Sequence, residues 1–191
     1  MSSRNRPAGH VGVVGQSKED NGRAGGGFQS PVARGAGRKM FRLRTEAFID
    51  APPEAVWAVL GDFARYPTWN PLMVEARGRV ERGAHVKMKV RPPGGLGQVY
   101  GFTATMTRVE RPGALEWTGG IPGVMHGRHF FLLSAEGTGT RLVHGEDFSG
   151  VVTWVAGRML KTLQSSYEAL NRALAERVKA ELANPSVSTL A

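Results

Sequence analysis

The feature that most constrains this chain is one long apolar stripe near its C-terminus. From about residue 151 to about residue 183, large apolar side chains recur at steps of three or four residues, which is the period of one face of an α-helix. Asn184-Pro185 then supplies a stop signal. Such a helix would be close to 50 Å long, at about 1.5 Å per residue, so we expect its end beyond about Val178 to extend past the rest of the domain. The stripe consists of Val155, Met159, Leu163, Tyr167, Leu170, Leu174, Val178 and Leu182.

The chain before this stripe has the two-residue period of β-strands. Residues 41–50 alternate between apolar and polar side chains. Two short helices are predicted over about residues 53–60 and 62–70, where Pro67 and Pro71 end the second. Short connections between the later strands predict antiparallel pairing. Six further strand-like runs cover about residues 73–80, 84–90, 99–110, 114–118, 124–134 and 140–148.

This order of elements predicts an α+β fold in which the long helix covers one face of a seven-stranded antiparallel sheet. A single helix about 10 Å wide cannot cover so many strands unless the sheet curls around it. A curled sheet leaves space between itself and the helix. We therefore predict an internal apolar cavity for a small hydrophobic ligand.

The first 39 residues differ in composition from the rest. They contain nine of the 26 glycines and few large apolar residues, so we predict that they form a disordered basic tail. They also hold seven basic and two acidic residues, a surplus of five out of the net +9. Met40 directly precedes the first strand, and one hypothesis is that it is the true start of the protein. The predicted domain covers residues 40–184, with 185–191 as a C-terminal tail.

Several classes of protein are disfavoured by composition. The chain has no cysteine, which excludes disulfides and thiolate chemistry and makes the cytoplasm the expected compartment. No run of about 18 apolar residues predicts a membrane span. The folded part is only mildly basic, so no specific nucleic-acid partner is predicted. No cofactor is predicted, because neither glycine-rich stretch has the strand and helix context of a nucleotide-binding loop. Oligomeric state and peripheral membrane contact stay open.

Specific segments resemble a known family. The segment Phe48–Pro71, FIDAPPEAVWAVLGDFARYPTWNP, resembles the opening of the START/Bet v 1-like superfamily (SRPBCC), near its polyketide cyclase/dehydrase and lipid transport branch. Residues 115–117, 127–133 and 139–150 also resemble it, so the likeness covers roughly residues 40–183. The resemblance implies the helix-grip fold, a curved antiparallel sheet around a long C-terminal helix. It says little about activity, because one fold hosts many functions.

Two residues are candidates for acid/base chemistry, His129 and Glu146, and their proximity depends on hairpin register. If Leu133 opposes Thr140, His129 opposes His144 and shares one face with Phe131, Glu146 and Phe148. If Ser134 opposes Thr140, Arg128 opposes Glu146 instead. The segments that resemble the family, in which histidine, phenylalanine and leucine alternate, favour the first register. The alternative interpretation of the pair is orientation of a polar ligand end or structural hydrogen bonding.

Other residues are candidates for the walls of the cavity, although ordinary core packing would use the same side chains. His129, His144 and Glu146 could also approach a metal ion, but nothing in the sequence supplies supporting groups around them, so no metal site is predicted. The predicted ligand-binding residues are Trp69, Trp117, Phe131, His144, Phe148, Met159, Leu163 and Tyr167.

Three functions remain in competition. The first is binding or transfer of a small hydrophobic molecule such as a lipid, quinone or polyketide. The second is an enzyme of the polyketide cyclase or dehydratase type that uses His129 and Glu146, although the sequence leaves open whether there is any catalysis. The third is an interaction module that uses the basic N-terminal tail on nucleic acid or an acidic surface.

Overall fold

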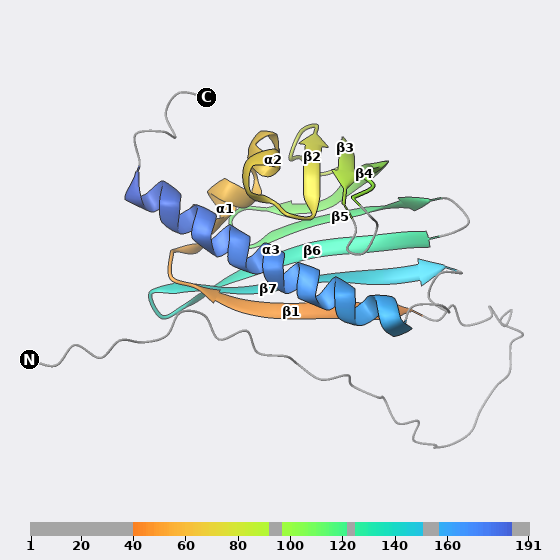
Figure 1. Cartoon of the computed structure of the whole chain (residues 1–191). Helices are drawn as coiled ribbons and strands as arrows, with labels where there is room; N and C mark the ends of the chain where they lie inside the picture. The colour runs from red at the N-terminus through yellow and green to blue at the C-terminus, as the bar shows by residue number, and fades with distance from the viewer. Residues whose placement is uncertain (1–39, 92–96, 122–124, 151–156, 185–191) are drawn as a thin grey trace, which may run out of the picture.

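Seven strands form one antiparallel sheet in the order β1-β7-β6-β5-β4-β3-β2, as Figure 1 shows. A computed structural model describes residues 40–91, 97–121, 125–150 and 157–184. Each pair of neighbours is antiparallel, which confirms the predicted sheet. The strands are β1 (Phe41–Ile49), β2 (Met73–Arg77), β3 (His85–Val90), β4 (Tyr100–Glu110), β5 (Ala114–Ile121), β6 (Met125–Glu136) and β7 (Gly139–Gly150).

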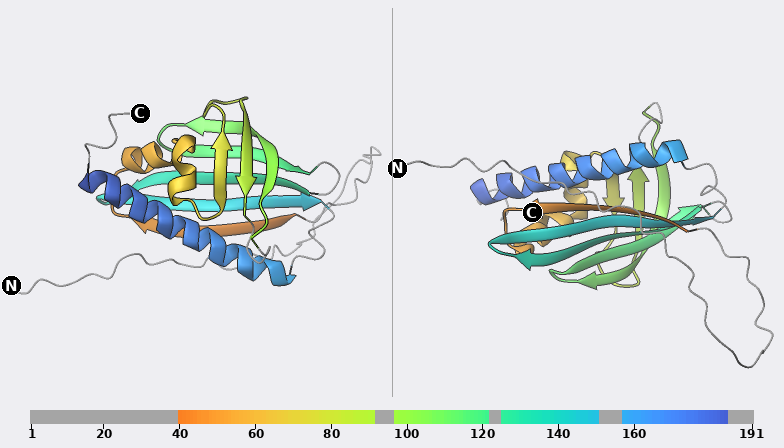
Figure 2. Two further views of the ribbon diagram at one scale, coloured as in Figure 1. Left: turned by 45° about the horizontal axis from the view of Figure 1, so that its top comes forward. Right: turned by 90° about the horizontal axis from the view of Figure 1, so that it is seen from below.

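One long helix runs along the concave face of this sheet, as the two views of Figure 2 show. This helix is α3 (Gly157–Ala183), and the short helices α1 (Pro53–Leu60), η1 (Phe63–Arg65) and α2 (Tyr66–Trp69) follow β1. The protein therefore has the α+β helix-grip fold. Within the described ranges, no helix combines the length and apolar character that a membrane span needs. The predicted disorder of residues 1–39, the tail 185–191 and a helix start near residue 151 lie outside the described residues.

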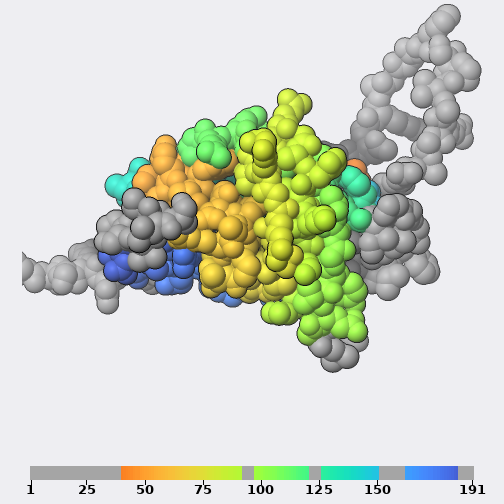
Figure 3. Space-filling view, turned by 90° about the horizontal axis from the view of Figure 1, so that it is seen from above, coloured from red at the N-terminus to blue at the C-terminus, as the bar shows by residue number. Residues whose placement is uncertain are grey.

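The apolar stripe of α3 is the side that faces the sheet. Tyr167, Leu170, Leu174 and Val178 are at most 1% exposed, whereas Leu182 is 53% exposed. The helix therefore extends past the core beyond Val178, as its length predicts. On the side shown in Figure 3, the chain from α1 to β3 forms one continuous surface beside α3.

The β6–β7 hairpin determines which side chains meet under α3. Ala135 pairs with Thr140 across a two-residue turn, in which Gly137 has a φ of 59°. Both predicted registers are therefore wrong, because the turn is tighter than either assumes. The pairing differs from the favoured register by two residues, so the same side chains share the concave face. His129 opposes Glu146 rather than His144, and Phe131 opposes His144.

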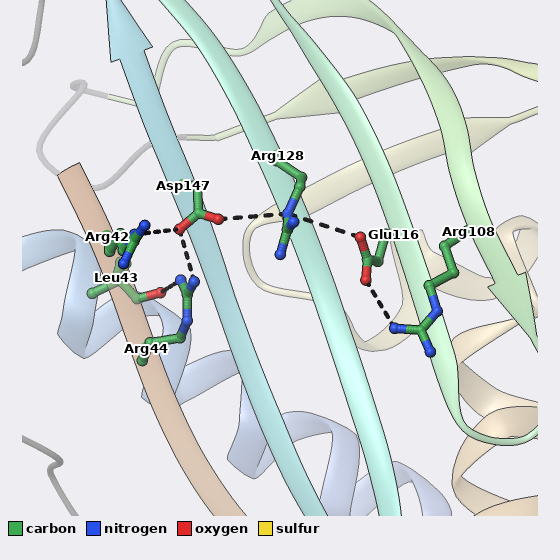
Figure 4. A network of polar contacts seen from close by, with 7 residues as sticks. All are labelled: Arg42, Leu43, Arg44, Arg108, Glu116, Arg128 and Asp147. Carbon is green, nitrogen blue, oxygen red and sulfur yellow. Dashed lines mark hydrogen bonds and ion pairs between the residues drawn. The ribbon is translucent and has the colours of Figure 1, made fainter. Parts of the chain in front are cut away.

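The convex face of the sheet carries a row of alternating charges, as Figure 4 shows, and the Arg44 and Arg128 guanidinium groups of this row cover the buried ring of Phe130. Asp147 contacts Arg44 at 2.7 Å and Arg128 at 3.5 Å, and Glu116 contacts Arg128 at 3.8 Å. Arg108 extends the row at 3.4 Å from Glu116. Because the side chains of these arginines are about a third to a half exposed, such pairs add little stability individually. They make this the solvent face of the sheet.

A buried polar link joins α3 to the sheet. Nδ1 of His144 on β7 lies 2.7 Å from Oδ1 of Asn171 on α3. Nδ2 of Asn171 donates a hydrogen bond to Oγ1 of Thr45 on β1 at 3.0 Å. All three residues are at most 3% exposed. Burial, followed by the neighbouring His129, holds the pKa of His144 well below its ordinary value. His144 is therefore a neutral part of the core.

The core role of the α3 stripe predicts a contrast between two leucines of the same helix. Leu170→Ala is expected to lower the free energy of unfolding by about 2–5 kcal/mol, because it leaves a cavity under the helix. Leu182→Ala is the matched control and is expected to change it by less than about 0.5 kcal/mol. Urea denaturation measures both. Equal losses for the two variants would contradict the assigned face of α3.

The buried neutral His144 predicts a pH dependence of stability. Below about pH 6.5 the unfolded chain protonates this residue while the folded chain does not, so the unfolded state binds more protons and stability falls as pH falls. The contribution reaches about 1.4 kcal/mol per pH unit. His144→Gln should flatten the decline measured by urea denaturation between pH 7.5 and 5.5. The exposed His85 provides the control H85Q, and equal slopes in both variants and the wild type would refute the assignment.

Candidate ligand site on the concave face

Three side chains from β6, β7 and α3 meet at the carboxylate of Glu146. Tyr167 donates its hydroxyl proton to Oε2 of Glu146, and His129 Nδ1 lies 3.4 Å from the same oxygen. The Tyr167 hydroxyl is also 3.2 Å from His129 Nδ1. Burial, and next the adjacent Glu146, raises the pKa of Tyr167 well above its ordinary value. Tyr167 is thus a permanent donor to the carboxylate.

Behind His129, the contacts continue into the link between α3 and the sheet. His129 Nε2 and His144 Nε2 are 3.0 Å apart, and the chain of contacts then runs through Asn171 to Thr45. Thr45 Oγ1 donates to the backbone carbonyl of His144 at 3.1 Å. We call this set the inner polar cluster, and it comprises Thr45, His129, His144, Glu146, Tyr167 and Asn171.

Aromatic rings enclose the inner polar cluster. The indole of Trp117 stacks on His129 with ring centres 4.5 Å apart and planes within 9°. His144 lies between Phe131 and Tyr167, with its ring centre 4.3 Å from each of theirs. Stacking restricts rotation of both imidazole rings, so each ring nitrogen has a defined partner.

Exposure increases along the concave face from one end to the other. On β7, Leu142 and His144 are fully buried, whereas the side chain of Glu146 is 18% exposed and Phe148 is half-buried. On α3, Leu163 is likewise half-buried, one turn before the buried Tyr167. The polar cluster therefore ends, at Glu146, in a region that solvent-sized molecules reach.

Two glycines leave room for neighbouring side chains, Gly127 for Glu146 and Gly119 for Phe102. Gly119 on β5 pairs with Gly127 on β6. A Cβ on Gly119 would lie 2.8 Å from the Phe102 ring, and a Cβ on Gly127 would overlap Oε1 of Glu146. Gly127 is not one of the described glycines with a positive φ, so its backbone conformation does not require glycine. What requires glycine here is the space that the carboxylate occupies.

The structure brings together most of the side chains that the sequence predicts. His129, His144, Glu146, Tyr167, Trp117 and Phe131 are in mutual contact. Phe148 stacks on Phe41 at 6.2 Å. Trp69 lies apart on α2, and its ring reaches Trp117 through Tyr66 and Phe63. Its buried Nε1 has no hydrogen-bond partner within the described ranges. The side chain of Met159 lies outside the described part.

Sequence reasoning missed three residues of the site, Thr45, Asn171 and Gly127. Thr45 is a polar residue at an inward position of the alternating first strand, and Asn171 lies beside Leu170 on the apolar side of α3. Each is a polar residue where the pattern calls for an apolar one. That mismatch is the signal that could have identified Thr45 and Asn171.

The arrangement of the two imidazoles and the carboxylate is not that of a metal site. Across the residues whose placement is described, no group of three or more histidine, cysteine or acidic side chains is arranged to hold a metal ion. The two Nε2 atoms face each other at 3.0 Å, which is a hydrogen-bond distance. The atoms thus bind one another rather than a common ion.

Comparison with known proteins identifies a family that matches this sequence. The family described as polyketide cyclase / dehydrase and lipid transport matches residues 40–179. An aromatase/cyclase, Zhui from Streptomyces sp. R1128, is 16% identical, with a TM-score of 0.62 over 78% of this chain and 99% of that one.

Two other solved structures share the fold at low sequence identity. A Staphylococcus aureus protein of unknown function is 10% identical, with a TM-score of 0.64 over 78% of this chain and 99% of that one. The structure of Ara h 8.0201 is 12% identical, with a TM-score of 0.57 over 74% and 99%. A comparison with curated protein sequences finds no match. The family match covers most of the chain, and the protein therefore belongs to the polyketide cyclase / dehydrase and lipid transport family.

Proposed function

We propose that the protein binds or transfers a small hydrophobic molecule between α3 and the concave face of the sheet, with one end of the molecule beside Glu146. The observation that carries this proposal is the partial exposure of Glu146, whose side chain is 18% exposed beside half-buried apolar residues of the concave face. A charged group is expensive to bury without full compensation. An accessible carboxylate at the edge of an apolar interior is suited to a ligand with a polar end.

The surroundings of Glu146 support an apolar partner. Half-buried Phe102, Phe148 and Leu163 lie on the same side as the carboxylate. Phe102 and Leu163 pack against the core, and Phe148 stacks on Phe41. Ligand sites for small molecules are mostly apolar with a few placed polar groups. The family description, which includes lipid transport, is consistent with this composition.

A second function, proton transfer during cyclisation or dehydration, is favoured by the contacts of the carboxylate itself. Glu146 is the accessible member of a group that includes Tyr167 and His129. A carboxylate with a neighbouring imidazole can remove a proton from carbon next to a carbonyl and return it elsewhere. Glu146 would then contact the substrate, and His129 would relay the proton.

Binding is tested with 2-ethylnaphthalene as an apolar probe in equilibrium dialysis. Wild-type protein is expected to bind it saturably with one site per chain. Leu163→Lys should weaken binding at least about tenfold, because it brings a charge into the apolar region. Leu182→Lys changes an exposed position on the same helix and should leave affinity unchanged. Absence of saturable binding, or equal weakening by both variants, would refute the proposal.

Proton transfer is tested by hydrogen–deuterium exchange at carbon 1 of 2-tetralone in D₂O, followed by NMR. Glu146 takes the proton, the electron pair of the C–H bond is delocalised as an enolate, and solvent deuterium replaces the proton on carbon. Glu146→Gln should slow the protein-dependent exchange about 10²- to 10⁴-fold. The exposed Glu136 supplies the control E136Q. Exchange no faster than in buffer, or equally fast in E146Q, would exclude the catalytic role and leave binding alone.

A further inference from the structure

The inner polar cluster has a defined hydrogen-bond direction that begins at Thr45. A backbone carbonyl only accepts, so the Thr45 hydroxyl uses its proton on the carbonyl of His144, 3.1 Å away. Asn171 must then present its NH₂ group to Thr45 Oγ1, at 3.0 Å. The carbonyl oxygen of the Asn171 side chain therefore faces His144 Nδ1, at 2.7 Å.

This orientation determines the tautomers of both histidines. His144 must carry its proton on Nδ1, because Asn171 Oδ1 can only accept. A neutral His144 then has a lone pair on Nε2. His129 Nε2 lies 3.0 Å from that lone pair and must donate to it. The Nε2 proton of His129 is thus used in the hydrogen bond to His144, and the other ring nitrogen of His129, Nδ1, faces Glu146.

Both hydrogen-bonding contacts that the described residues make with the carboxylate are on the side of Oε2. Tyr167 donates to Oε2, and His129 Nδ1 is 3.4 Å from the same oxygen. Both contacts use the same oxygen, so Oε1 of Glu146 takes part in neither and is positioned as a hydrogen-bond acceptor.

Oε1 is also the atom that a ligand can reach. It lies over Gly127, where a Cβ would overlap it. It has no hydrogen-bond partner among the described residues, yet the side chain retains 18% exposure. With no partner from the described residues, this oxygen is an acceptor that a ligand can use.

We infer that the ligand of this site is a hydrophobic molecule with a hydroxyl group that donates a hydrogen bond to Glu146 Oε1. This inference rests on the proposed binding function and adds the chemical class of the ligand. A carbonyl or ether oxygen at the same position would face another acceptor and be rejected. Thr45, Asn171 and His144 are positioning residues, because they direct the protons of the cluster away from Oε1 without touching the ligand.

The test compares 2-naphthol with 2-methoxynaphthalene, which keeps the oxygen and loses the donor. Wild-type protein at neutral pH should bind 2-naphthol at least about tenfold more tightly, as expected for a hydrogen bond to a charged group. In Glu146→Gln, the amide oxygen accepts from Tyr167 and the NH₂ group faces the ligand. The tenfold preference should therefore disappear. Equal affinities in the wild type, or an unchanged preference in E146Q, would overturn the inference.

Thr45→Val tests the positioning role, because it removes the hydroxyl that orients Asn171 while keeping the shape of the side chain. The preference for 2-naphthol should fall several-fold, while the affinity for 2-ethylnaphthalene stays constant. Thr103→Val, at an exposed position on β4, is the matched control. A loss of affinity for both probes alike would indicate a structural role only and would overturn the assignment of Thr45.

The tautomers can be observed without any variant. Long-range ¹H–¹⁵N NMR spectra of the wild type should show His144 protonated on Nδ1 and His129 protonated on Nε2. The opposite tautomer of His144 would overturn the inference. The outcome for 2-ethylnaphthalene separates the two proposals: if it binds and 2-naphthol has no advantage, only the ligand class is wrong, whereas no binding of any probe refutes the binding function and this inference with it.

Discussion

The structure depends on one geometric constraint, the covering of a seven-stranded sheet by the single helix α3. The sheet meets this constraint by curling, so that β1 and β7 contact the helix directly, while α1, η1 and α2 extend the cover beside it. Side chains along α3 are fully buried at Leu170 and Leu174 but half-buried at Leu163. The helix therefore closes one end of the concave face and leaves the other end partly accessible.

The inner polar cluster lies where those two regions meet. Asn171 and Tyr167 on the helix form hydrogen bonds with Thr45, His144 and Glu146 on the sheet. The same contacts that attach α3 therefore orient the accessible carboxylate. The convex face instead carries partly exposed arginines around Asp147 and Glu116. The contacts that attach α3 and the contacts that orient Glu146 therefore lie together on the concave face.

The periodicity of the sequence was sufficient to predict the fold, because strand alternation and the helical stripe each reflect which face is buried. The pairing of His129 with Glu146 could not be predicted, because register depends on the length of the turn at Gly137. The prediction of which β6 and β7 side chains share the concave face was nevertheless correct, since a register error of two residues leaves each side chain on the same face. Gly127 was missed because its role, an empty volume filled by Glu146, arises only when β6 and β7 are in place. Asn171 had a signal in the sequence, a polar residue on the apolar side of α3, but its buried partners could not be predicted.

The central claim is that an apolar ligand lies between α3 and the concave face, beside Glu146. Isotope-filtered NOE spectroscopy of the labelled protein with 2-ethylnaphthalene tests it most directly. The account predicts contacts from the probe to the methyl groups of Leu163 and the ring of Phe148, which are half-buried on the inner side. Contacts confined to the exposed Phe48 or to other convex-face residues, or no contacts at saturation, would contradict it.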